Sequence, residues 1–210
     1  MYNSSLPCQY IVIDNLADGD YTLQSTTNSK HVVGEDCYGD NTMWTGLRIH
    51  GDTVAEIAPQ FVPEDRLSLN PKNVAAVQIS SRWRILDFDQ KRTAAERAVA
   101  VIKHYGLSFI CFVGQPSCPG ETPMTYWLNA QGKAPSGAMA GEDAISFSPN
   151  AIAVQKIGQR WKVADGNNWL LDFGPAEGNA KAALYFIKKY GFKYICFAGR
   201  PNPPMTYFRK

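Results

Sequence analysis

Residues 187–201 read IKKYGFKYICFAGRP, and residues 102–116 read IKHYGLSFICFVGQP. The two stretches align without a gap over their whole length. A repeat at a fixed spacing identifies a structural unit before any single element is assigned. The chain therefore contains a duplicated module, and comparing the two copies guides every prediction below.

The repeat extends beyond this stretch in both directions. The first copy lacks seven residues between its Arg-Trp pair and its Leu-Asp-Phe triplet, and it carries four extra residues around position 119. The further matches are residues 64–65 with 142–143, 82–83 with 160–161, 86–88 with 171–173, and 123–126 with 204–207. We predict a β-rich N-terminal segment over 1–62, module A over 63–129, a linker or long loop over 130–141, and module B over 142–210.

Composition narrows the class of protein. The chain has 210 residues, of which 45% are hydrophobic and 19% charged, and this balance is typical of a folded globular protein. A net charge of +2 argues against nucleic acid or an anionic membrane as a partner. No apolar run approaches the roughly 20 residues that a membrane span needs. The first residues lack the pattern of a signal peptide, so either the protein is cytoplasmic or Met1 replaces a removed leader, and we favour secretion.

The five cysteines fall into two groups. Cys111 and Cys196 occupy equivalent places in apolar runs, which predicts buried thiols. Cys8, Cys37 and Cys118 lie in polar surroundings. In a secreted protein, a disulfide between Cys8 and Cys37 is expected.

Hydrophobic periodicity predicts the elements. Short alternating runs between Gly and Asn turns predict a small antiparallel sheet within residues 1–62. Each module then shows strands, a helix and two further strands. The first helix is predicted to begin with a capping box of Thr93 and Glu96 and to end at Gly106, and the second ends at Gly191. The predicted fold class is α+β, with two homologous β-β-α-β-β modules that each pack one helix on a small antiparallel sheet.

Module B carries a recognisable pattern: WKVADG at 161–166, LDFG at 171–174, CFAGRP at 196–201, and then Tyr207. This pattern resembles a module of uncharacterised, secreted microbial proteins. The resemblance covers both modules and not residues 1–62. No established activity belongs to that family, so the resemblance implies no catalytic residue. The residues DGNN at 165–168 predict a tight hairpin turn in module B. Module A departs from the pattern because it lacks this hairpin and has Gln115 where module B has Arg200.

The features found in module B indicate a ligand site. An exposed indole can stack on the C–H groups of a sugar while neighbouring amides and carboxylates bind its hydroxyls. A core role is the alternative for the tryptophans, above all for Trp161. Arg200 is expected either to clamp an anionic group or to pair with Asp172. The predicted ligand-binding residues are Asp165, Asn167, Asn168, Trp169, Arg200 and Tyr207.

Asp87 and Asp172 recur in equivalent Leu-Asp-Phe triplets. A pair of catalytic carboxylates is conceivable for them. Alternation, however, places each aspartate opposite a core-facing Leu and Phe, which favours a carboxylate bound to backbone or to an arginine.

No catalytic or metal-binding residue and no cofactor is predicted. The sequence has no HExxH, GxSxG or P-loop motif, and its three histidines share no metal spacing. We therefore predict a non-enzymatic, lectin-like protein whose partner is a carbohydrate or glycoconjugate. Two alternatives stay open: a hydrolase or toxin with Cys37 beside His31 or His50, and a protein-binding inhibitor that uses the loop at 199–204.

Overall fold

A computed structural model describes residues 15–27, 30, 32, 34, 42–84, 86, 88–114, 124–200 and 205–210. Fourteen strands and two helices follow one another along the chain. They are β1 (Gly19–Thr26), β2 (Thr42–His50), β3 (Thr53–Ile57), β4 (Asp65–Ser68), β5 (Val77–Ile79), β6 (Arg82–Arg84), α1 (Arg92–Tyr105), β7 (Leu107–Val113), β8 (Met124–Asn129), β9 (Asp143–Ser146), β10 (Ile152–Ile157), β11 (Arg160–Asp165), β12 (Asn168–Asp172), α2 (Glu177–Tyr190), β13 (Tyr194–Ala198) and β14 (Met205–Arg209).

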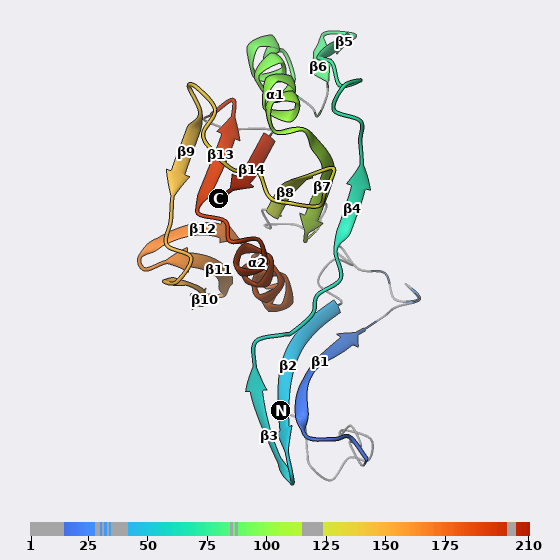
Figure 1. Cartoon of the computed structure of the whole chain (residues 1–210), viewed down its shortest axis with the longest axis vertical. Coiled ribbons are helices and arrows are strands. Elements are labelled where there is room, and N and C mark those ends of the chain that lie inside the picture. The colour runs from blue at the N-terminus through green and yellow to red at the C-terminus, as the bar shows by residue number, and fades with distance from the viewer. Residues whose placement is uncertain are drawn as a thin grey trace.

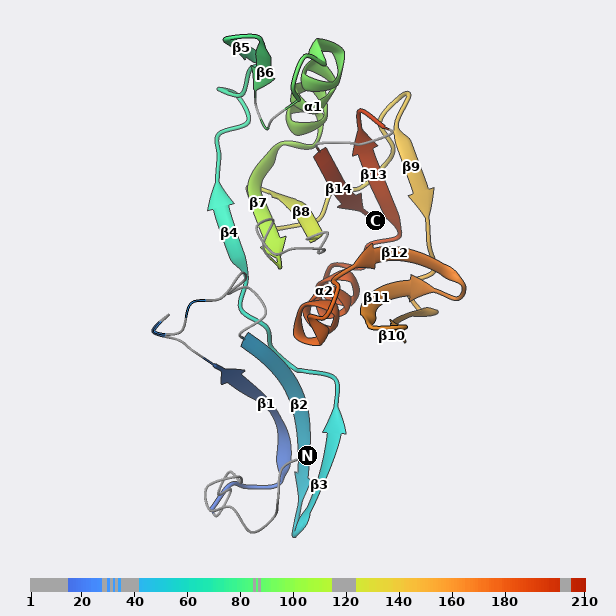
Figure 2. The same cartoon turned by 180° about the vertical axis from the view of Figure 1, so that it is seen from behind.

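The N-terminal segment forms an antiparallel sheet of β1, β2 and β3, which confirms that part of the prediction. This sheet projects from one end of the molecule (Figure 1). From there β4 leads toward the opposite end, where the β5–β6 hairpin lies beside α1 (Figure 2). Cys8, Cys37 and Cys118 lie outside the described residues.

The predicted fold class is wrong. The described part of the chain is mostly β, with 44% of its residues in strands and 17% in helices. Four three-stranded antiparallel sheets and a two-stranded hairpin replace the expected pair of helix-on-sheet modules. In each copy the first strand does not pair with the next strand in sequence. It pairs instead with the strand that follows the helix, so β4 pairs with β7 and β9 pairs with β13. The strands between them form separate sheets, β5–β6 in one copy and β10–β11–β12 in the other.

The two copies also exchange their packing partners. One core contains the inner face of α2 together with strand residues of module A, including Cys111, Met124 and Tyr126. The other contains the inner face of α1 together with the equivalent residues of module B, Cys196, Met205 and Tyr207. Both cysteines are fully buried and free, as predicted.

Aromatic contacts make this exchange specific. The Tyr126 ring lies 5.3 Å from that of Phe186 and 5.7 Å from that of Tyr190, both on α2. Tyr207 lies 6.0 Å from Tyr105 at the end of α1. Where β8 meets β14, the Trp127 indole N–H donates to the carbonyl of Thr206 at 3.1 Å. The two modules therefore share both cores.

The sequence correctly predicted the C-terminal ends of both helices but not the N-terminal cap of α1. Gly106 and Gly191 adopt left-handed conformations with φ of 60° and 63°, and their N–H groups close the helices as predicted. The predicted capping box is wrong, because Lys91 is the N-cap and no side chain caps α1. Glu96 instead pairs with Arg92, one turn away, at 2.7 Å.

Gly46 permits a close approach within the N-terminal sheet. A Cβ atom there would lie 2.1 Å from the backbone oxygen of Ala58 and 2.7 Å from that of Ile57. Because backbone cannot retreat as a flexible side chain can, Gly46→Ala is expected to destabilise the protein by about 1–3 kcal/mol. Thermal unfolding measures this effect. Gly34→Ala is the control, since no atom of the other described residues lies within 4 Å of its Cβ position. Equal melting temperatures for the two variants would contradict the prediction.

Candidate functional site

The β11–β12 hairpin brings four of the predicted ligand residues together. Asp165 pairs with Asn168 across the turn, and Gly166 has a φ of 60° that favours glycine. The Asp165 carboxylate accepts the Ser148 N–H at 2.8 Å, which fixes its position. The side chains of Asn167 and Asn168 are exposed and make no hydrogen bond to another described residue. Their amides are therefore available to a ligand.

Trp169 is held at the base of this turn. Its side chain is 56% exposed, although indole is among the largest apolar groups. The Lys162 ammonium lies 4.2 Å from the ring centroid, within the range of a cation–π contact. Lys162 in turn contacts the Asp172 carboxylate at 3.1 Å. This chain of contacts orients the indole without burying it.

Of the two roles considered for Asp172, the structure shows a carboxylate that is bound to backbone and to an arginine. Its carboxylate accepts from Arg160 Nε at 2.9 Å and from the N–H of Gly174 at 3.0 Å. Burial alone would raise the pKa of Asp172, but these bonds and that from Lys162 lower the pKa below its usual value. An arginine is thus its partner, but it is Arg160 and not Arg200. The equivalent Asp87 lies outside the described residues.

Arg200 and Tyr207 do not join the hairpin. Arg200 forms a two-pronged ion pair with Asp143 and lies over the Phe197 ring, beside the first turn of α1. Tyr207 is fully buried. Comparison of the two copies grouped these residues by module, whereas the fold places Tyr207 in a different sheet from the hairpin and Arg200 after the end of β13.

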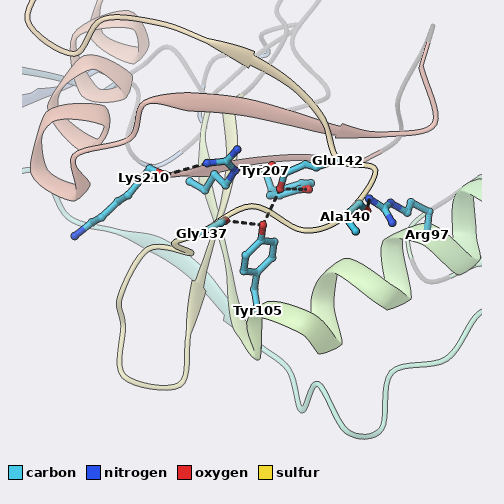
Figure 3. Close-up of polar contacts among 8 residues, drawn as sticks. Arg97, Tyr105, Gly137, Ala140, Glu142, Tyr207 and Lys210 are labelled. Atoms are coloured by element: carbon cyan, nitrogen blue, oxygen red, sulfur yellow. Dashed lines mark hydrogen bonds and ion pairs between the residues drawn. The ribbon is translucent and has the colours of Figure 1, made fainter.

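Tyr207 belongs to a buried polar cluster centred on Glu142 (Figure 3). The Glu142 side chain is 4% exposed and pairs with Arg209 Nε at 2.5 Å. The hydroxyls of Tyr105 and Tyr207 donate to the same carboxylate at 2.7 Å and 2.9 Å. Nearby, Arg97 donates to the carbonyl of Ala140 at 3.0 Å, so the segment over 130–141 is tied to α1.

The cluster has a counterpart around Glu64, which the repeat aligns with Glu142. Tyr190 donates its hydroxyl to Glu64, and Lys189 contacts the same carboxylate at 3.0 Å. Tyr126, the counterpart of Tyr207, departs from the pattern because its buried hydroxyl has no hydrogen-bond partner among the described residues. Sequence comparison aligned both glutamates but did not identify this cluster. Tyr105 and Tyr190, which occupy equivalent positions at the two helix ends, could have indicated the cluster from the sequence.

The burial and hydrogen bonds of this cluster favour a structural role over a catalytic one. Burial raises the pKa of Tyr207 and that of Tyr105, and their hydrogen bonds to Glu142 raise both further. Burial also raises the pKa of the Cys196 thiol to about 12, so the thiol stays protonated near neutral pH. The groups around Glu142 therefore supply neither a base nor a nucleophile.

The residues proposed for a hydrolase are only partly described. Cys37 and His31 lie outside the described residues, as do residues 201–204 of the predicted inhibitor loop. His50 is exposed and contacts Asp18 at 2.7 Å. Within the described ranges, no group of three or more His, Cys, Asp or Glu side chains is arranged to hold a metal ion. Both helices have 14 residues, and no helix in the described part is long and apolar enough to cross a membrane.

The equivalent tyrosines provide a matched pair of substitutions. Tyr207→Phe removes a hydrogen bond to a charged carboxylate and is expected to cost about 2 kcal/mol of unfolding free energy. Tyr126→Phe removes a buried hydroxyl without a described partner and is expected to leave stability unchanged or raised. Urea unfolding of both variants measures the difference. The assignment fails if Tyr126→Phe is the more destabilising of the two.

Glu142 is expected to make stability depend on pH. Burial alone would raise the pKa of Glu142, but bonds from Tyr105, Arg209 and Tyr207 lower it below its usual value. A depressed pKa in the folded state stabilises above the unfolded value of about 4.3, and this stability is lost as pH falls through the folded pKa.

Glu142→Gln should therefore be about 3 kcal/mol less stable at pH 7, since Arg209 loses its buried partner. The variant should also lose less stability than the parent protein between pH 5 and acid. Urea unfolding at a series of pH values tests both statements. If the unfolding free energies of the two proteins changed in parallel with pH, Glu142 would not be the source of the pH dependence.

Comparison with known proteins gives one match. The lysyl oxidase family model matches residues 1–58, which is 58 of the 210 residues and lies outside both modules. No curated protein and no solved structure matches the chain. In the described part, the matched region contains β1, β2 and β3, and it does not extend into either repeated module.

Proposed function

We propose that this chain is a carbohydrate-binding protein whose ligand lies against the tip of the β11–β12 hairpin. The observation that carries the proposal is Trp169, an indole held half-exposed by Lys162 beside two asparagines whose amides have no described partner. Aromatic faces and amides together suit the alternating C–H and hydroxyl groups of a sugar. Asp165 adds a fixed carboxylate at the base of the turn.

The proposed site is smaller than the set of residues predicted from sequence. It consists of Asp165, Asn167, Asn168 and Trp169, with Lys162 as the residue that positions the indole. Arg200 and Tyr207 are left out because the first pairs with Asp143 and the second is buried. Module A lacks β12, so the proposal assigns one site to the chain and not two.

We further propose that the protein acts outside the cell. The match of residues 1–58 to lysyl oxidase, an extracellular family, supports that location. Extracellular glycans would then be accessible to the hairpin. Of the two alternatives, neither the hydrolase nor the inhibitor is favoured by a specific observation.

A glycan array screened with the intact protein and with Trp169→Ala tests the proposal. Truncating an aromatic that stacks on a sugar is expected to weaken binding by at least tenfold, since about 1.4 kcal/mol or more of contact is lost. Asn167→Ala should weaken binding less, because it removes hydrogen bonds only. Phe61→Ala is the control, as Phe61 is 61% exposed and lies outside the hairpin.

Selective binding that disappears with Trp169→Ala and survives Phe61→Ala supports the site. Binding that survives both Trp169→Ala and Asn167→Ala would place the ligand elsewhere. No binding across a broad array would remove the carbohydrate proposal itself.

A further inference from the structure

A groove of about 700 Å³ runs between the N-terminal sheet, β10 and α2. No residue of the proposed sugar site lines it. Its apolar walls are Ile57, Ala58, Pro59, Val154, Leu184 and Tyr185. A volume of this size lies within the range of small-molecule sites, which are mostly apolar with few polar groups.

Three of the four charged residues that line the groove lie on α2, and the fourth, Glu56, lies on β3. Lys181, Leu184, Tyr185 and Lys188 follow one another at spacings of three, one and three residues, so they form a single stripe along α2. Leu184 and Tyr185 therefore lie between two lysines, and an apolar molecule on this floor has a cation near each end.

Three lysines of α2 line the groove, and their ammonium groups differ in what they contact. Lys181 is already paired, with Glu56 at 2.9 Å and Glu177 at 3.1 Å. Lys189, also at the rim, is paired with Glu64 at 3.0 Å. Lys188 is exposed, and its ammonium makes no ion pair or hydrogen bond with another described residue. Among the described lysines of the groove, it is thus the one whose ammonium is left for a ligand.

The opposite wall of the groove is fixed before any ligand arrives. The Lys181–Glu56 pair joins α2 to β3. Close to the start of α2, a Cβ atom at Gly178 would lie 3.1 Å from the Cα of Met43, so the helix and β2 are in tight contact. A preformed wall lowers the entropy that binding would otherwise cost.

We propose that this groove binds a free amphiphile with one apolar chain and a single anionic head group, such as an alkyl carboxylate. The chain lies over Leu184 and Tyr185, and the head group pairs with Lys188. A cationic head is disfavoured because three lysines and one glutamate line the groove. A neutral head would leave Lys188 without a counter-charge.

Calorimetry with the full chain and monomeric decanoate tests the proposal. Decanoate is expected to bind with a stoichiometry of one. Decyltrimethylammonium, which has the same chain and the opposite charge, is expected to bind at least tenfold more weakly. Lys188→Glu should weaken decanoate binding about tenfold, since reversal replaces an attraction with a repulsion. Leu184→Asn should weaken the binding of both compounds.

Lys193→Glu is the matched control for charge, because Lys193 is exposed, its side chain has no ion pair or hydrogen bond with another described residue, and it does not line the groove. It should bind decanoate like the parent protein, as should Trp169→Ala, which separates this site from the sugar site. Melting temperatures confirm that each variant is folded. The proposal is overturned if decanoate does not bind, if the two lysine variants bind alike, or if the cationic compound binds equally well.

Discussion

Each helix of this protein packs on the strands of its own copy and also covers strand residues of the other copy. Cys111 and Tyr126 lie in the core of α2, and Cys196 and Tyr207 lie in the core of α1. A single module of 65 to 70 residues buries too little surface for more than marginal stability. Exchange of packing partners supplies the missing burial to both copies at once. Every other feature depends on this arrangement, since the polar clusters, the hairpin sheet and the N-terminal sheet all attach to these two cores.

The turns and helix ends of this fold could be predicted from the sequence, whereas the pairing of its strands could not. The turn at Gly166 and the helix ends at Gly106 and Gly191 depend on a few neighbouring residues, so sequence pattern identified them. The pairing of β4 with β7 spans a helix and a hairpin, and periodicity carries no information about it. The apolar run at 109–113 indicated burial on both faces, but it could not say that the second face meets the other module's helix.

The candidate site shows the same division. Asp165, Asn167, Asn168 and Trp169 are adjacent in sequence, so a correct hairpin prediction kept them together. Arg200 was expected to clamp an anionic group or to pair with Asp172, whereas the register of β9 against β13 brings Asp143 to it. Tyr207 has a counterpart, Tyr126, in the copy that lacks the hairpin. That recurrence already favoured a role in the shared core over a role in a site found in one module.

The two copies have diverged where the exchange of packing partners does not constrain them. One buried position has also diverged: Leu128, in the core of α2, stands where module B has Arg209. Among the described residues, Glu142 therefore has a buried arginine partner and Glu64 does not. Only module B has β12. The N-terminal sheet contacts α2, at Gly178 and Lys181. The groove needs both that sheet and β10, and the hairpin site needs β12. Because a buried side chain contacts both copies, a change there must suit two surroundings, whereas a change at an outer edge must suit one. The residues that distinguish the copies are therefore concentrated around α2 and the hairpin sheet, and the interior keeps the symmetry of the duplication apart from the position of Leu128 and Arg209.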